Sequence, residues 1–153
     1  MGKRRQAREA ALKLLYALEM TQVRAEEILA APWTLDIVPE EAREFTTALV
    51  LGAMTHREDI DVLIQTASLH WSLERIGLVE RNILRSAIYE LLYMPDIPPK
   101  VTINEAVEIA KRYGAAEASV FVNGILDRIK QDALPRPQEA LSTVPDASLF
   151  SSR

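Results

Sequence analysis

Apolar residues recur at helical spacing through most of this chain, and no other feature constrains the fold as strongly. Ala7, Ala11, Leu14 and Leu18 fall at positions i, i+4, i+7 and i+11, which is one stripe of a 3.6-residue period. Later segments repeat the pattern, and none shows the sustained two-residue alternation of a half-buried strand. The spacing therefore predicts an all-α protein.

About seven helices are expected, with boundaries set by proline, glycine and charge. Pro39 suits a first helical turn, and Glu40 and Glu41 beside it suit the positive end of the helix dipole. Whether residues 39–69 form one helix or two stays open. The expected helices cover residues 1–20, 24–31 (ended by Pro32), 39–56, 57–69, 79–94, 102–114 and 117–131.

Two of these segments carry specific signals. Thr102 and Glu105 have the spacing of a capping box, and Gly114 is a typical helix stop. Gly124 lies in an Asn-Gly pair, yet apolar residues keep helical spacing across it. We therefore place Gly124 inside a helix, at a cost of ~1 kcal/mol against alanine, and expect another backbone to approach it closely.

The composition is that of one ordinary globular domain. Of 153 residues, 48% are apolar and 26% charged, and no run approaches the ~20 apolar residues of a membrane span. There is no cysteine, which excludes disulfides and fits a reducing, cytoplasmic setting. We expect a helical domain over residues 1–133 and a disordered C-terminal tail over 134–153. The tail is rich in proline and serine and shows no helical periodicity of apolar residues.

The first thirteen residues are basic although the chain is acidic. They hold five cations and one acid, which is a net charge of +4. Because the whole chain carries −4, the remaining residues carry −8. Arg4 and Arg8 lie beside the apolar stripe, where they would border the packed face, and Arg5 lies within reach of Glu9. Guanidinium groups suit phosphate and unpaired bases, so this arm is a candidate RNA site, with a solvated helix end as the alternative.

The sequence holds no arrangement typical of catalysis. His56 and His70 are the only histidines, and neither has a partner at metal-ligand spacing. The phosphate-loop, dinucleotide, serine-hydrolase and zinc-protease motifs are all absent from the sequence. We therefore expect a binding protein rather than an enzyme, without metal or cofactor.

Four segments together resemble the NusB family of bacterial transcription antitermination factors. They are "RQAREAALKLLYA", "ERNILRSAIYELL", "PPKVTINEAVEIAKRYG" and "FVNGILD", and they occur in the family's order and spacing. The resemblance implies an all-helical fold of two small packed bundles. It also implies binding to boxA-type single-stranded RNA, a heterodimer with the ribosomal protein NusE, and action on elongating RNA polymerase in support of ribosomal RNA transcription.

The resemblance assigns functional residues position by position. It implies RNA-binding roles for Arg4, Arg5, Arg8 and Phe121, and NusE-binding roles for Tyr16, Glu74, Glu80 and Glu117. The chain departs from the family at Gln6 and Val120, where relatives are often basic, and at the pair Ala116–Glu117, where two acids are common. A helical adaptor that binds protein without touching RNA is the alternative.

Overall fold

The computed structural model describes residues 2–30, 38–69 and 72–134, and all regular secondary structure in this part of the chain is helical. This part contains seven α-helices, two short 3-10 helices and no strand, which confirms the predicted fold class. The α-helices are α1 (Lys3–Thr21), α2 (Ala25–Ala30), α4 (Arg43–Thr55), α5 (Arg57–Ser68), α6 (Leu78–Tyr93), α7 (Pro99–Tyr113) and α8 (Ala118–Ala133); the 3-10 helices are η1 (Glu40–Ala42) and η2 (Leu73–Arg75). Pro32 and residues 135–153 of the predicted tail lie outside the described residues, while Leu134, the first residue of that tail, packs against the second core.

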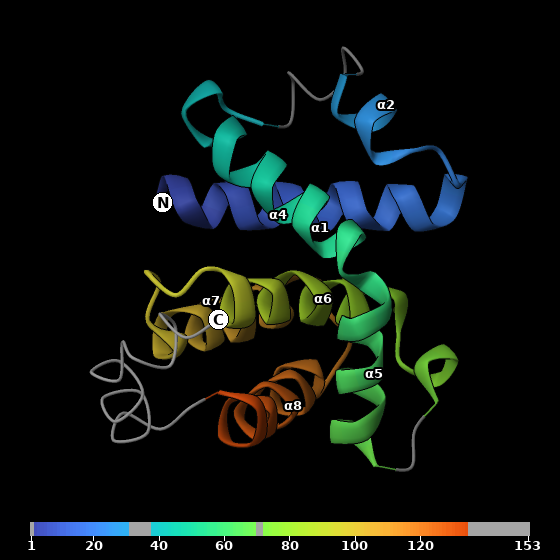
Figure 1. Cartoon of the computed structure of the whole chain (residues 1–153), viewed down its shortest axis with the longest axis vertical. Helices are drawn as coiled ribbons and strands as arrows, with labels where there is room; N and C mark the ends of the chain where they lie inside the picture. Colours follow the sequence, from blue (N-terminus) through green and yellow to red (C-terminus); the bar gives the residue numbers. More distant parts are fainter. Residues whose placement is uncertain (1, 31–37, 70–71, 135–153) are drawn as a thin grey trace, which may run out of the picture.

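The helices form two bundles that meet along α1 and α6. Figure 1 shows α1, α2 and α4 in one layer and α5 to α8 in the other. The stripe predicted on α1 is buried in the first core, where Ala7, Ala11 and Leu14 are fully covered. The predicted arrangement of two packed bundles is confirmed.

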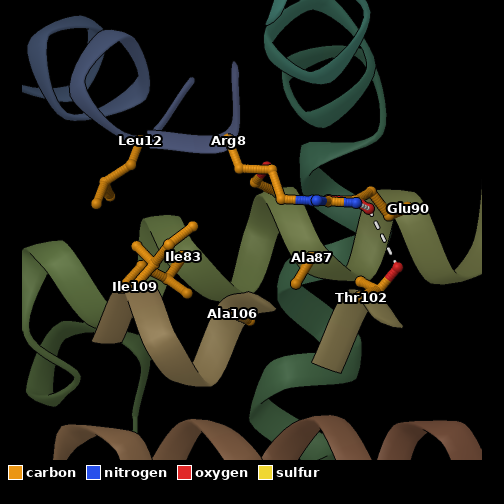
Figure 2. Close-up of a pocket in the computed structure, with 9 residues that line it drawn as sticks. Arg8, Leu12, Ile83, Ala87, Glu90, Thr102, Ala106 and Ile109 are labelled. Atoms are coloured by element: carbon orange, nitrogen blue, oxygen red, sulfur yellow. Dashed lines mark hydrogen bonds and ion pairs between the residues drawn. The ribbon is translucent and has the colours of Figure 1, made fainter. Parts of the chain in front are cut away.

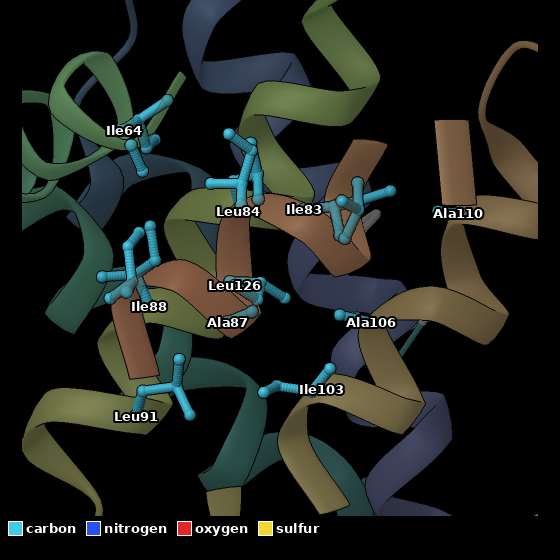
Figure 3. Packing of buried hydrophobic residues seen from close by; sticks show 14 of the residues in the cluster. Ile64, Ile83, Leu84, Ala87, Ile88, Leu91, Ile103, Ala106, Ala110 and Leu126 are labelled. Carbon is cyan, nitrogen blue, oxygen red and sulfur yellow. The ribbon is translucent and has the colours of Figure 1, made fainter. Parts of the chain in front are cut away.

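The second core is larger and centres on α6. Figure 3 shows Leu84 and Ile88 of α6 packed among Ile64 of α5, Ile103 of α7 and Leu126 of α8. Each fully buried leucine or isoleucine stabilises the fold by about 1.5–3 kcal/mol relative to its exposed state. The apolar faces of α5, α7 and α8 thus converge on α6.

Residues 39–69 form two helices, which answers the question left open by the sequence. α4 ends at Thr55 and α5 begins at Arg57, with His56 between them. The His56 ring stacks on Tyr93 with centroids 4.0 Å apart, and Tyr89 packs against both cores. The chain therefore passes from the first bundle to the second at His56.

The predicted capping box is wrong. α7 begins three residues earlier, at Pro99, because proline fits a first helical turn and Pro98 precedes it in extended conformation. Thr102 is buried inside the helix and donates a hydrogen bond to Glu90, while Glu105 pairs with Arg5. The helix does end at Gly114, as predicted.

The prediction that another backbone approaches Gly124 closely is also wrong. Gly124 lies inside α8 as predicted, but it faces outward, and nothing lies within 4 Å of the position a Cβ would take. The glycines in close contact are others. A Cβ on Gly52 would collide with the Tyr89 ring, and one on Gly114 would lie 2.6 Å from the Cβ of Ala118.

Candidate functional site

The basic N-terminal turn of α1 borders an open groove beside the start of α7. The groove is lined by Gly2, Arg4, Arg5, Arg8, Asp96, Ile97, Pro98, Val101 and Glu105, and we call it the arginine groove. Arg4 is exposed, and its guanidinium carbon lies 4.6 Å from the centre of the Phe45 ring. A guanidinium in this position is held by a cation–π contact while its N–H groups stay available.

Arg5 lines the same groove but has a carboxylate partner. Its Nε and Nη2 donate to the two oxygens of Glu105 at 2.6 and 2.7 Å. The hydrogen bond to Glu105 raises the pKa of Arg5, and the same bond lowers the pKa of Glu105. The pairing of Arg5 with Glu9 suggested by sequence spacing is wrong, because Glu105 on α7 offers a bidentate partner.

Arg8 lines the arginine groove but is buried there, contrary to the expectation that its guanidinium group is exposed at the margin of the packed face. Its side chain is 5% exposed, and its Nε and Nη2 each donate to Glu90 at 2.9 Å. Thr102 donates a third hydrogen bond to Glu90 at 3.1 Å. Figure 2 shows these side chains reaching from α1, α6 and α7 toward one point. Arg8 therefore ties the basic helix to the second bundle.

The pocket beside Arg8 is too small for a ligand. It is enclosed by Leu12, Ile83 and Ile109 among other side chains, and its volume of about 20 Å³ holds roughly one water molecule. This pocket is an imperfection of packing under α1. The open arginine groove is therefore the candidate site at this end of the molecule.

A second groove lies beyond the other end of α7. It is lined by Arg75, Ile76, Gly77, Glu80, Ala115, Ala116, Glu117, Ala118 and Phe121, and we call it the Phe121 groove. Three residues predicted from the resemblance, Glu80, Glu117 and Phe121, therefore come together here. Phe121 is half-buried and packs against the second core, which leaves part of its ring on the groove.

Glu80 anchors one wall of the Phe121 groove. Its Oε2 accepts a hydrogen bond from the Ala115 N–H at 2.9 Å, which fixes the turn between α7 and α8. Its carboxylate fills the space where a Cβ on Gly77 or Gly114 would lie. The same turn ends at Glu117, whose φ of 70° is left-handed.

Tyr16 and Glu74 are exposed but do not line the Phe121 groove. Tyr16 lies on α1 with 39% of its surface exposed, near the exposed Met20 and Val23 at the end of that helix. Glu74 lies in η2, next to the groove residue Arg75. The residues assigned to the partner from the resemblance are thus spread over α1, η2, α6 and the turn before α8.

A polar network that the sequence did not reveal joins the two bundles at Glu19. Its carboxylate accepts hydrogen bonds from Arg81, Asn82 and Arg85, each at 2.9 Å. Burial opposes ionisation of Glu19, but the bonds from Arg81 and Asn82 and the charges of Arg85 and Arg81 lower its pKa to about 2. Arg85 also pairs with Asp61 on α5. No local spacing signals this network, because its partners lie more than sixty positions from Glu19.

The described residues contain no group of three or more histidines, aspartates or glutamates able to hold a metal ion. Across residues 2–30, 38–69 and 72–134, no helix combines the length and apolar character of a bilayer span. Two open grooves of this part of the chain hold residues predicted from the resemblance: one is lined by arginines, and the other bears an aromatic ring with acids. Two helical bundles carrying such grooves define a helical binding protein.

Comparison with known proteins gives the family. The sequence model of the NusB family matches residues 5–131, so the chain belongs to the NusB family. A transcription antitermination protein NusB from Trichlorobacter lovleyi is 48% identical over 143 residues, covering 94% of this chain and 99% of the relative. One from Syntrophus aciditrophicus is 41% identical over 149 residues, covering 92% of each chain.

Solved structures agree with this assignment. NusB of T. maritima is 42% identical and superposes with a TM-score of 0.78, covering 86% of this chain and 93% of the other. A chain in a complex of antitermination factors NusB and NusE with double-stranded RNA is 29% identical, with a TM-score of 0.73 over 86% of this chain and 98% of that one. The family is one of non-enzymatic factors, in accord with the prediction of a binding protein.

Proposed function

We propose that this protein is a transcription antitermination factor that binds boxA-type single-stranded RNA as a heterodimer with NusE. It acts in the cytoplasm on elongating RNA polymerase and supports transcription of ribosomal RNA. Family membership supports the general role, and a related chain has been solved with NusE and RNA. The observation that carries the RNA assignment is the arginine groove, where Arg4 and Arg5 line an open surface.

In this proposal Arg4 and Arg5 contact RNA directly, and Phe121 contacts a base from the second groove. Arg4 lies over the Phe45 ring and has no hydrogen-bond partner among the described residues, and Arg5 forms an ion pair with Glu105. Guanidinium forks bind phosphate oxygens in pairs and stack on unpaired bases, and an aromatic ring stacks in the same way. Arg8 contributes by holding α1 in position, since its donors bond to Glu90 inside the protein.

NusE is proposed to bind across Tyr16, Glu74, Glu80 and Glu117. Three of these four are acids, and Glu74 and Glu117 are exposed carboxylates. A basic partner surface would complement them, and the exposed ring of Tyr16 would supply apolar contact area. The turn at Glu117 is fixed from within by Glu80, which favours a preformed surface over one that folds on binding.

A helical adaptor that binds only protein is the second candidate. Two acids, Asp96 and Glu105, line the arginine groove and offset the positive charge of its arginines. The net charge of −4 on the whole chain also favours a protein-only adaptor, because it disfavours binding of a polyanion. A groove neutralised by its own carboxylates would hold RNA weakly unless further cations or a partner protein contribute.

Titration of the protein with a labelled boxA-like RNA at low and high salt separates the two candidates. We expect binding that weakens steeply with salt and that drops when Arg4 and Arg5 are both replaced by alanine. Arg24→Ala combined with Lys130→Ala removes the same charge from exposed positions outside the groove and is the matched control. Absence of RNA binding at low salt, with NusE binding intact, would establish the protein-only adaptor instead.

A further inference from the structure

The two grooves lie at opposite ends of α7, so a single RNA strand that touches both must cross the surface between them. The arginine groove includes Pro98 and Val101 at the start of the helix, and the Phe121 groove includes residues 115–118 just beyond its end. α7 has 15 residues and is therefore about 22 Å long. This distance is too great for the terminal arginines alone to bridge.

The surface between the grooves is the contact line of α1 and α7, which we call the α1–α7 seam. Arg5 of α1 meets Glu105, Glu9 meets Arg112 and Tyr113, and Lys13 lies over the Tyr113 ring. Because Arg5, Glu9 and Lys13 are spaced four residues apart, they share one face of α1 and follow α7 in the same direction. The seam is thus continuous from the arginine groove toward the turn at Gly114.

Two cations on the seam are exposed. Lys13 lies 5.7 Å from the centre of the Tyr113 ring, and no carboxylate of the described residues lies within ion-pair distance of its Nζ. Arg112 lies 5.4 Å from the same ring, and its side chain is 54% exposed although Nη1 bonds to Glu9 at 3.1 Å. The carboxylate of Glu9, by contrast, is covered, with an exposed fraction of 11%, and accepts from both Arg112 and the Tyr113 hydroxyl.

We propose that Lys13 and Arg112 form a second phosphate-binding site, which carries single-stranded RNA along the α1–α7 seam from the arginine groove to the Phe121 groove. Lys13 lies eight residues beyond Arg5, about 12 Å along α1. The Tyr113 ring holds both cations by cation–π contact, while Glu9 faces inward.

The inference rests on the proposed RNA-binding function and is tested by Lys13→Gln, alone and combined with Arg112→Gln. Each phosphate contact to a single strand contributes ~0.7 to the salt slope, which amounts to about fivefold in affinity at 0.1 M salt relative to 1 M salt. We therefore expect Lys13→Gln to weaken binding of an RNA of about twelve nucleotides roughly fivefold, and the double variant roughly 25-fold. An RNA of about four nucleotides, confined to the arginine groove, should bind all forms equally.

Controls distinguish the seam from general charge and from unfolding. Arg24→Gln with Lys130→Gln makes the same charge change off the seam and should leave both affinities within twofold. Arg112 is bonded to Glu9, so melting temperatures are measured, and Lys13→Gln alone decides the question if the double variant is unstable. If the Lys13→Gln variant binds the long RNA as tightly as the parent does, the α1–α7 seam does not bind RNA, and the proposed role of the arginine groove is unaffected. A parent protein that binds neither RNA would overturn both proposals.

Discussion

The guanidinium of Arg8 and the carboxylate of Glu90 form two parallel hydrogen bonds of 2.9 Å between α1 and α6, and both side chains are buried. An arginine at the edge of a basic segment thus serves as the anchor of that segment. Burying two charges is costly, and the pair persists because the geometry is bidentate and Thr102 donates a further bond. The ion pair therefore fixes the position of α1, and with it the position of the exposed Arg4, which lies one helical turn away.

Replacing Arg8 should therefore destabilise the fold far more than replacing Arg4. Arg8→Ala leaves the Glu90 charge buried without its partner, which costs about 3–5 kcal/mol, whereas Arg4→Ala at an exposed position should stay within about 0.5 kcal/mol. Urea unfolding of both variants measures the difference. Similar midpoints for the two variants would show that the pair does not anchor α1.

The stability of the protein should fall in acid partly through Glu19. Its pKa is lowered from 4.5 to about 2, so its ionised form stabilises the fold above about pH 4.5, and this contribution is lost as the pH falls toward 2. A shift of this size corresponds to roughly 3 kcal/mol. Glu19→Gln should be less stable than the parent at pH 7, and the gap should close by pH 2, as measured by denaturant unfolding at both pH values. A gap that does not change with pH would contradict the network.

Substitution of two glycines by alanine should have opposite effects. At Gly124 the space is open, so alanine should stabilise α8 by up to about 1 kcal/mol through its helix propensity. At Gly114 the added Cβ would lie 2.8 Å from the Ala110 carbonyl oxygen and 2.6 Å from the Ala118 Cβ, so alanine should destabilise by about 1–3 kcal/mol. Thermal unfolding of the two variants tests this, and a destabilised Gly124→Ala would restore the close approach first expected there.

Features set by local periodicity were predictable from the sequence. The stripe from Ala7 to Leu18 is buried in the first core as expected, and α7 ends at Gly114. In both cases the signal lies within a few residues of the feature it predicts. The same local signal failed at Thr102, because its hydroxyl bonds to Glu90 across the helix interface instead of capping its own helix.

Features set by contacts between distant segments were not predictable in this way. Arg8 and Glu90 are 82 positions apart, and Arg5 and Glu105 are 100 apart, so spacing within α1 could not assign their partners. The family resemblance assigned Phe121 to RNA and Glu80 and Glu117 to NusE, and the structure places all three on one groove. Their proposed roles toward RNA and NusE remain predictions.

Variants of Glu80 should separate its charge from its hold on the neighbouring turn. Glu80→Gln keeps an oxygen that can accept from the Ala115 N–H, whereas Glu80→Ala removes it. We expect amide exchange at Ala115 to rise roughly tenfold in the alanine variant only, because one hydrogen bond is lost. NusE affinity should fall further in the alanine variant than in the glutamine variant. Equal losses in both would assign Glu80 a purely electrostatic contact with the partner.

RNA and NusE are proposed to bind this protein cooperatively, and RNA affinity measured with and without saturating NusE at one salt concentration tests this coupling. Few cations face the arginine groove, and Glu105 offsets one of them, so a basic partner that covers the exposed acids should add contacts for RNA. We expect NusE to tighten RNA binding by about 5–150-fold, and RNA to tighten NusE binding by the same factor. Equal RNA affinities with and without NusE would contradict the account.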